Sequence, residues 1–140
     1  LASGKGIYFD GGTTSANYLG GSDAYEEGPW DPTITAQEGS GATFTKTNLN
    51  YTKIGRFVVC SGKIQVSGSV GTSGGGIYLT LPFTASNNDS AGSGFEMAIV
   101  GYSCGVYGET PNSIRIVKYD STTAITANHA IRFSYSFYTS

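Results

Sequence analysis

The chain has 140 residues with a formal net charge of −2, 21 glycines and only 13 % charged residues. This length suits a single domain, and the charge balance offers no basic stripe for nucleic acid. No run approaches the ~18 consecutive apolar residues of a membrane-spanning helix. Good helix formers are few, while Thr, Tyr, Ile, Val and Phe are frequent, so the composition predicts an all-β protein.

The apolar core that this sequence can build is thin. Leu, Ile, Val and Phe make up 29 of the 140 residues, close to the ~20 % level below which chains tend towards disorder. The low charge and the ten tyrosines argue against disorder. We therefore expect neighbouring subunits to complete the core, so that the protein assembles as an oligomer.

Residues 1–22 differ in character from the remainder of the chain. They are rich in Gly, Ser and Thr and contain two Gly-Gly pairs, which are typical of turns or hinges. We interpret them as an N-terminal arm, either a loosely ordered end or an arm that pairs with a neighbouring copy. A β-sandwich head domain is expected over residues 23–140. Because residue 1 is Leu rather than Met, we expect a processed product or an excised fragment.

The sequence YEEGPWDP at residues 25–32 marks the entry to the head domain. Its two prolines favour extended backbone, and Trp30 would anchor the first strand in the core. The carboxylates Glu26, Glu27 and Asp31 could be imagined as a catalytic pair or a cation site. Side chains of adjacent residues point apart on an extended chain, and the ligand spacing of a calcium loop is missing. We therefore expect solvated or subunit-contacting carboxylates and no bound metal.

Short runs with period-two alternation follow, and they predict strands without helices. The expected strands are residues 30–35, 42–46, 49–54, 57–70, 77–81, 95–102, 104–107, 113–119 and 130–138. The connections include a hairpin turning on Gly55, a glycine-rich hairpin tip at 71–76, and surface loops at 85–94, 108–112 and 120–128. The last strand has the clearest pattern, with one apolar face made of Ile131, Phe133, Tyr135 and Phe137. Strands this short and numerous predict an antiparallel β-sandwich resembling a jelly roll.

Residue types that usually carry catalysis are sparse. His129, the only histidine, is expected to be a surface or partner-facing residue rather than the base of a hydrolase. The loop at 71–76 lacks the Lys-Ser/Thr pair of a phosphate-binding loop, so we expect no nucleotide and no other cofactor. Cys60 and Cys104 fit no zinc pattern, and two separate thiols are favoured over one disulfide, a choice that stays open. We expect no catalytic residues and no enzyme activity.

Ten tyrosines, one tryptophan and many small polar residues also describe a sugar-binding surface. Aromatic rings can stack on sugars there, while polar side chains bond the hydroxyls. The candidates for facing a partner are four tyrosines near predicted loops: Tyr102, Tyr107, Tyr119 and Tyr138. The alternative for each is an interior or interface position with its hydroxyl hydrogen-bonded.

Three motifs resemble those of a module found at the C-termini of bacteriophage tail-fibre and other virion fibre proteins. They are DAYEEGPWDPT at 23–33, YTKIGRFV at 51–58 and LPFT at 81–84, which are similar to DYEEGTWTPT, YTKIGNLVTV and LPFT in that family. The order and spacing of the motifs agree with the family over residues 4–84. The stretch GIYF at 6–9 also resembles the family's lead-in on the fibre side. The remainder matches only in character. The departures are the extra Ala24, and Pro29 where the family usually has Thr.

The resemblance implies a distal, homotrimeric tip of a virion fibre that attaches to a bacterial surface glycan or protein receptor. Its partners would be other virion fibre or capsid proteins and its location the virion, with no nucleic acid bound and no membrane insertion. The residues expected to hold the fold are Trp30, Tyr51, Ile54, Leu81, Phe83 and Phe133. Two alternatives stay open: a purely structural trimerisation or capsid-decorating module, and a polysaccharide-degrading enzyme, for which no acid–base pair is visible.

Overall fold

The computed structural model describes residues 7–8, 18–19, 25–37, 41–68, 75–120 and 125–140. Regular structure in these ranges is entirely β, which confirms the all-β class. The strands are β1 (Ile7–Tyr8), β2 (Tyr18–Leu19), β3 (Tyr25–Pro29), β4 (Ile34–Ala36), β5 (Thr43–Ile54), β6 (Phe57–Ser67), β7 (Ile77–Thr80), β8 (Ala91–Glu96), β9 (Ser103–Thr110), β10 (Ser113–Lys118) and β11 (Ala130–Tyr138). Within the described ranges there is no helix long and apolar enough to cross a membrane.

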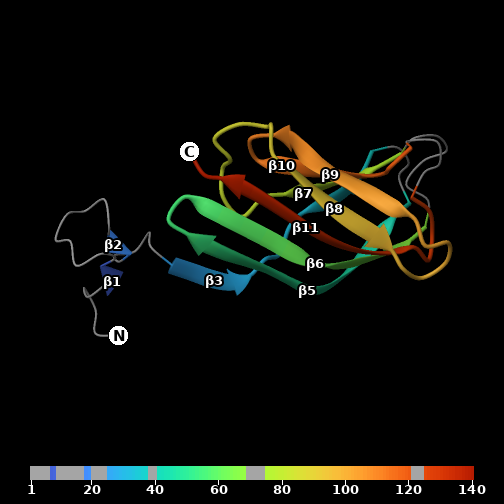
Figure 1. The fold of residues 1–140 in the computed structure, drawn as a ribbon. Helices are drawn as coiled ribbons and strands as arrows, with labels where there is room; N and C mark the ends of the chain where they lie inside the picture. The colour runs from blue at the N-terminus through green and yellow to red at the C-terminus, as the bar shows by residue number, and fades with distance from the viewer. Residues whose placement is uncertain (1–6, 9–17, 20–24, 38–40, 69–74, 121–124) are drawn as a thin grey trace.

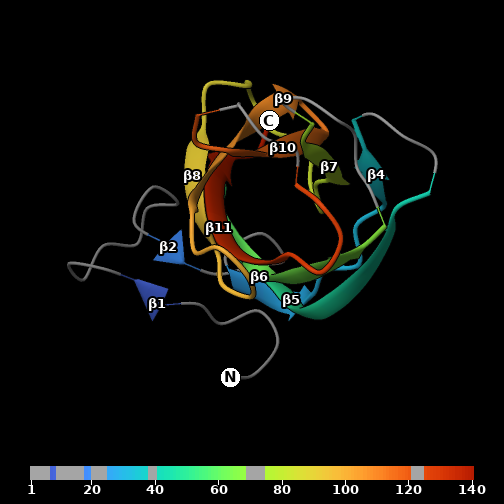
Figure 2. The ribbon, with the colours of Figure 1, turned by 90° about the vertical axis from the view of Figure 1, so that its right-hand side faces the viewer.

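Nine of the strands form one antiparallel sheet in the order β3-β5-β6-β11-β8-β9-β10-β7-β4. The sheet curls like half of a barrel, as the side and end-on views show (Figure 1, Figure 2). The buried apolar side chains form one core cluster. The jelly-roll sandwich expected from the sequence is not confirmed, because these strands form one continuous sheet. Most of the expected arm, residues 1–22, lies outside the described residues, apart from the pairing of β1 with β2.

Several predicted elements are confirmed where local pattern and tertiary packing agree. β11 spans Ala130–Tyr138, and Ile131, Phe133, Tyr135 and Phe137 are buried. β5 and β6 form the predicted hairpin, whose turn contains Gly55 at φ 59°, a conformation that glycine adopts at little cost. The runs predicted at 42–46 and 49–54 belong to a single strand, β5, which an irregularity between Thr47 and Asn50 interrupts.

Other predicted boundaries are wrong. The strand expected at 30–35 is replaced by β3 and β4, with residues 30–33 between them. β8 begins at Ala91, inside a predicted loop, and ends at Glu96, so residues 97–101 are a loop and not a strand. β9 continues to Thr110, inside the turn expected at 108–112. β6 and β7 are not neighbours in the sheet, so the connection containing 71–76, of which 71–74 lie outside the described residues, is no hairpin tip.

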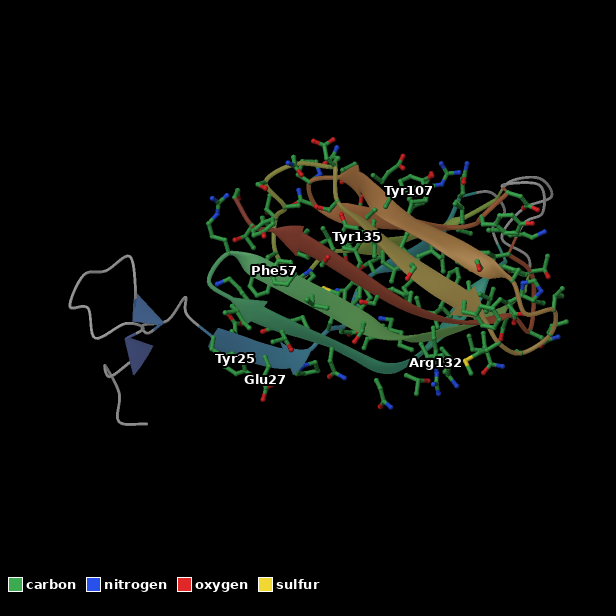
Figure 3. The ribbon with its side chains drawn as sticks, viewed as in Figure 1. Tyr25, Glu27, Phe57, Tyr107, Arg132 and Tyr135 are labelled. Carbon is green, nitrogen blue, oxygen red and sulfur yellow. The ribbon has the colours of Figure 1, made fainter. Side chains whose placement is uncertain are left out.

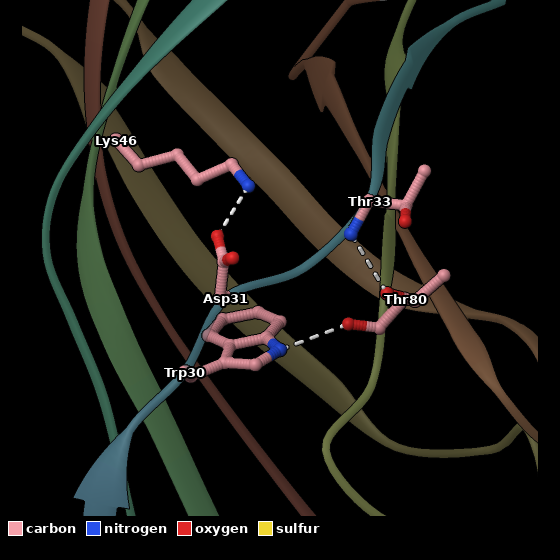
Figure 4. Close-up of polar contacts among 5 residues, drawn as sticks. All are labelled: Trp30, Asp31, Thr33, Lys46 and Thr80. Carbon is pink, nitrogen blue, oxygen red and sulfur yellow. Dashed lines mark hydrogen bonds and ion pairs between the residues drawn. The ribbon is translucent and has the colours of Figure 1, made fainter.

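Residues 30–33 carry the chain from one edge of the curled sheet, β3, to the opposite edge, β4. Trp30 N–H donates to the Leu49 carbonyl of β5 at 2.8 Å, and its indole Nε1–H donates to the Thr80 carbonyl of β7 at 2.9 Å. Thr33 N–H donates to the Thr80 hydroxyl at 3.0 Å, and Lys46 of β5 pairs with Asp31 (Figure 4). This crossing therefore links both halves of the curled sheet, and Trp30 supplies two of the hydrogen bonds that do so.

Candidate functional site

Strand register distinguishes the two ends of the curled sheet. At the end where the chain enters the sheet, Tyr25 pairs with Ile54, and Phe57 pairs with Tyr138; we call this the entry end. Glu96 pairs with Ile131, near the other terminus of β11, and marks the far end. Figure 1 shows the β8–β9 connection at the end opposite the start of β3. A surface at the far end is therefore directed away from the point of entry.

At the far end, Glu96 is fully buried and organises the loop that follows it. Its carboxylate accepts N–H hydrogen bonds from Ala98 at 2.7 Å, Val100 at 2.8 Å and Gly101 at 3.0 Å, as well as from Ile99 and Ala130. Burial acts to raise the pKa of Glu96, but these backbone donors outweigh it and lower the pKa to about 2. An ionised carboxylate is thus the centre of the β8–β9 loop.

The loop held by Glu96 exposes apolar side chains to solvent. Met97, Ile99 and Val100 are 45, 56 and 68 % exposed, and Phe95, just before Glu96 on β8, is 49 % exposed. We call these four residues the apolar loop. Exposed apolar side chains that gather in one place mark interaction sites more often than scattered ones do. The sequence signal that could have predicted this loop is a single Glu within the apolar run 95–100, followed by Gly101. In the structure Gly101 has a positive φ of 71°.

Tyr102 and His129 support the same end of the domain from within. The Tyr102 hydroxyl lies 2.8 Å from His129 Nδ1, and their rings meet edge to face at 5.4 Å. His129 is buried, so the expected surface position is wrong; the reason is that its ring also lies within hydrogen-bond distance of Thr126. Burial raises the pKa of Tyr102, with smaller contributions from Cys104 and Glu96. The Tyr102 hydroxyl is thus engaged inside the protein.

The remaining tyrosine candidates do not form one surface. Tyr107 is half-buried, and the Arg115 guanidinium lies 5.8 Å from its ring and 5.7 Å from that of Tyr78. Tyr119 is exposed beside the far end, where its N–H bonds to the carbonyl of Ser103. Tyr138 is exposed at the entry end. Of these three tyrosines, only Tyr119 therefore lies close to the apolar loop.

Two pairs of predicted anchors meet in the folded chain, and one anchor does not reach the core. Trp30 and Phe133 are buried with ring centroids 6.0 Å apart, and Tyr51 and Phe83 pack edge to face at 5.1 Å. Leu81 is half-buried against the core. Ile54 is 46 % exposed, so its prediction as an anchor is wrong. The alternation of β5 turns Lys53 inward instead, and the Lys53 ammonium lies 5.5 Å from the Phe83 ring centroid.

The carboxylates of the entry motif point apart, as predicted. Glu26 accepts a hydrogen bond from the Tyr51 hydroxyl, and Glu27 accepts one from Tyr25 at 2.6 Å. The two glutamates sit on opposite faces of β3, since Glu26 is half-buried and Glu27 exposed. In the part of the chain that the structure describes, no three His, Cys, Asp or Glu residues gather as metal ligands.

Cys60 and Cys104 are free and buried, which confirms the prediction of two separate thiols. Burial raises the pKa of Cys60 to about 12 and that of Cys104 to about 11. Both thiols therefore remain protonated near neutral pH and behave as small apolar residues.

Taken together, the described residues can present a fixed apolar surface at the far end of the curled sheet and a continuous sheet face behind it. No protein-family model, curated protein or solved structure matches the chain.

Proposed function

We propose that the protein is a non-enzymatic attachment domain, the distal tip of a virion tail fibre that binds a bacterial surface glycan. The observation that carries this proposal is the apolar loop. A buried carboxylate that accepts several backbone N–H bonds keeps Met97, Ile99 and Val100 exposed at the end opposite the chain entry. Such preorganisation lowers the entropic cost of binding a partner.

The resemblance of residues 4–84 to fibre-tip modules supports the same proposal. It adds a homotrimer on the virion, with a jelly-roll-like sandwich as a finer description of each head and other fibre or capsid proteins as neighbours. The entry motif that carries the resemblance also links the two halves of the curled sheet through Trp30. A fibre attached at the entry end would leave the far end free to meet the host.

Staining of cells tests attachment directly. The fluorescently labelled protein is expected to stain a subset of bacterial strains that differ in surface polysaccharide. The double substitution Ile99→Ser and Val100→Ser keeps the backbone donors to Glu96 but removes two exposed apolar side chains. We expect it to reduce staining by about tenfold or more while leaving the native mass and the melting temperature unchanged. Equal staining by the variant would remove the apolar loop from the proposal.

A second candidate function, a purely structural trimerisation or decoration module, is favoured by the surface at the entry end. Tyr25, Ile54, Phe57 and Tyr138 lie opposite one another across four neighbouring strands and are all exposed. We call these four residues the entry row; Figure 3 shows Tyr25 and Phe57 at this end. The rings of Phe57 and Tyr138 lie 5.4 Å apart. An apolar row across an outer sheet face is suited to contact another copy.

Light scattering behind a sizing column tests this assembly. Three copies of 14.6 kDa predict a native mass of 43.8 kDa. The double substitution Phe57→Ser and Tyr138→Ser is expected to shift the protein to 14.6 kDa, because subunit contact would no longer bury two aromatic side chains. Far-ultraviolet circular dichroism should be unchanged, since both residues are exposed. A wild-type monomer would overturn the trimer, and a trimer that stains no strain would favour the purely structural function.

A further inference from the structure

We propose that a groove on the outer face of the sheet binds the negatively charged group of an acidic sugar. The groove has a volume of about 410 Å³ and is lined by Thr47, Asn48, Ser61, Gly62, Lys63, Arg132 and Phe133. It lies on β5, β6 and β11 towards the far end, where Figure 3 shows Arg132. The inference rests on the proposed attachment function and names the chemistry that this function would recognise.

A β-bulge builds one wall of the groove. Thr47 pairs with Lys63 and Asn50 with Ser61, so two residues of β5, Asn48 and Leu49, oppose the single residue Gly62. Asn48 adopts a positive φ of 51°, a conformation that costs a non-glycine residue energy. A Cβ at position 62 would lie 2.2 Å from Leu49 Cδ2 and 2.9 Å from the Asn48 carbonyl oxygen. Bulges re-aim side chains and often occur next to functional sites.

Two cations face each other on adjacent strands beside this bulge. Arg132 of β11 is directly opposite Lys63 of β6. In the described part of the chain the ion pairs are Lys46 with Asp31 and Lys118 with Asp120, and neither Lys63 nor Arg132 has a carboxylate within ion-pair distance. Like charges placed directly opposite each other destabilise a sheet. A bound anion would convert this repulsion into attraction.

The neighbouring groups favour a sugar as the carrier of the anion. Arg binds carboxylate and phosphate oxygens through paired N–H donors, while the Thr47 and Ser61 hydroxyls and the Asn48 amide can bond sugar hydroxyls. Phe95 of the apolar loop pairs with Arg132 on its other side and is exposed, so its ring is available to stack on a sugar. The chemistry shared by the possible ligands is an oxyanion on a sugar, supplied by a uronate or a sugar phosphate.

Binding of defined probes to the full chain tests the groove and separates the two sources. Titrations would use oligogalacturonate and mannose 6-phosphate, with a neutral galacto-oligosaccharide and single-stranded DNA as comparisons. We expect one of the acidic sugars to bind, with an affinity that falls as salt rises. The double substitution Lys63→Gln and Arg132→Gln should weaken binding by about tenfold or more, because both charge-assisted contacts are lost. The matched control Lys46→Gln with Arg56→Gln changes the net charge equally at two positions that do not line the groove, and should bind as the wild type does.

A stability measurement provides a second readout that needs no ligand. Arg132→Thr removes the cross-strand repulsion and places a residue with high strand propensity on β11. In low salt we expect the melting temperature to rise by about 1–3 °C. A fall would show that Arg132 is kept for packing, and would count against a ligand-binding role.

Cell staining with the same variants separates failure of the groove from failure of attachment. Wild-type staining that the Lys63→Gln and Arg132→Gln variant loses would support both proposals. Equal staining by this variant would overturn the groove and leave attachment in place. Acidic-sugar binding without staining of any strain would support the groove and overturn attachment. Binding of neither acidic sugar, or tighter binding of DNA than of both, would overturn the groove.

Discussion

Replacement of Trp30 by Ala is expected to destabilise the protein by about 3–5 kcal/mol through loss of aromatic packing. The hydrogen bond from the indole to the Thr80 carbonyl is lost as well, and because Thr80 is exposed and water can replace the donor, this adds only about 0.5–1.5 kcal/mol. Trp30 packs against Phe133 and hydrogen-bonds strands on both sides of the curl. Since domains are stable by only ~5–15 kcal/mol, this single change should bring the fold close to its limit. Urea unfolding followed by circular dichroism measures the effect.

Two control substitutions define what the Trp30 result means. Trp30→Phe retains much of the aromatic packing but loses the indole donor, so we expect an intermediate loss. Tyr119→Ala removes an exposed aromatic side chain and should change stability by less than about 0.5 kcal/mol. A loss below ~1 kcal/mol for Trp30→Ala, where core substitutions of this kind cost several, would contradict the role of residues 30–33 in linking the two halves of the sheet.

Replacement of Glu96 by Gln is expected to cost about 3 kcal/mol or more, because the amide nitrogen is a donor that meets the donors of the loop. The carboxylate accepts N–H bonds from Ala98, Val100, Gly101 and Ala130. The loop amides should then exchange with solvent faster, which hydrogen-exchange mass spectrometry would detect. Glu109→Gln, an exposed glutamate on β9, is the matched control and should have little effect.

The same carboxylate predicts how stability depends on pH. The pKa of Glu96 lies at about 2 in the folded protein against 4.5 ordinarily. Its folded pKa is depressed, so its contribution is fully present above about pH 4.5 and is lost as pH falls towards 2. The integrated loss is on the order of 3 kcal/mol. The wild type should lose more stability than the Gln variant in this window, and parallel unfolding curves for the two proteins would contradict the assignment.

Alternation predicted secondary structure wherever one face of a strand is buried by its neighbours. β11 has the bounds expected from its apolar face, and the β5–β6 hairpin turns on Gly55. Alternation alone gave no warning at Glu96, because Phe95 before it and the apolar residues 97–100 after it together resemble a strand. The loop exists because backbone donors from residues 98–101 and from Ala130 converge on one buried carboxylate. That convergence depends on β11 lying beside β8, a long-range pairing that no local pattern reports.

The groove shows the same division between local and long-range information. Lys63 and Arg132 are separated by more than sixty positions in the sequence, and only the pairing of β6 with β11 places them opposite each other. Ile54 was expected to help hold the fold as an apolar residue of the motif YTKIGRFV, but the alternation of β5 turns Lys53 inward instead.

By itself, the sequence determined the all-β class, the outward and inward faces of the clearest strands, the hairpin at Gly55 and the importance of Trp30. These follow from propensity, period-two alternation and turn chemistry, which act between neighbours in the chain. Only the tertiary structure decided that the strands join in one curled sheet, that residues 30–33 cross between its edges, and that the apolar loop and the paired cations lie near one end. Strand order and register arise from contacts between distant segments, whose energies a local pattern does not contain.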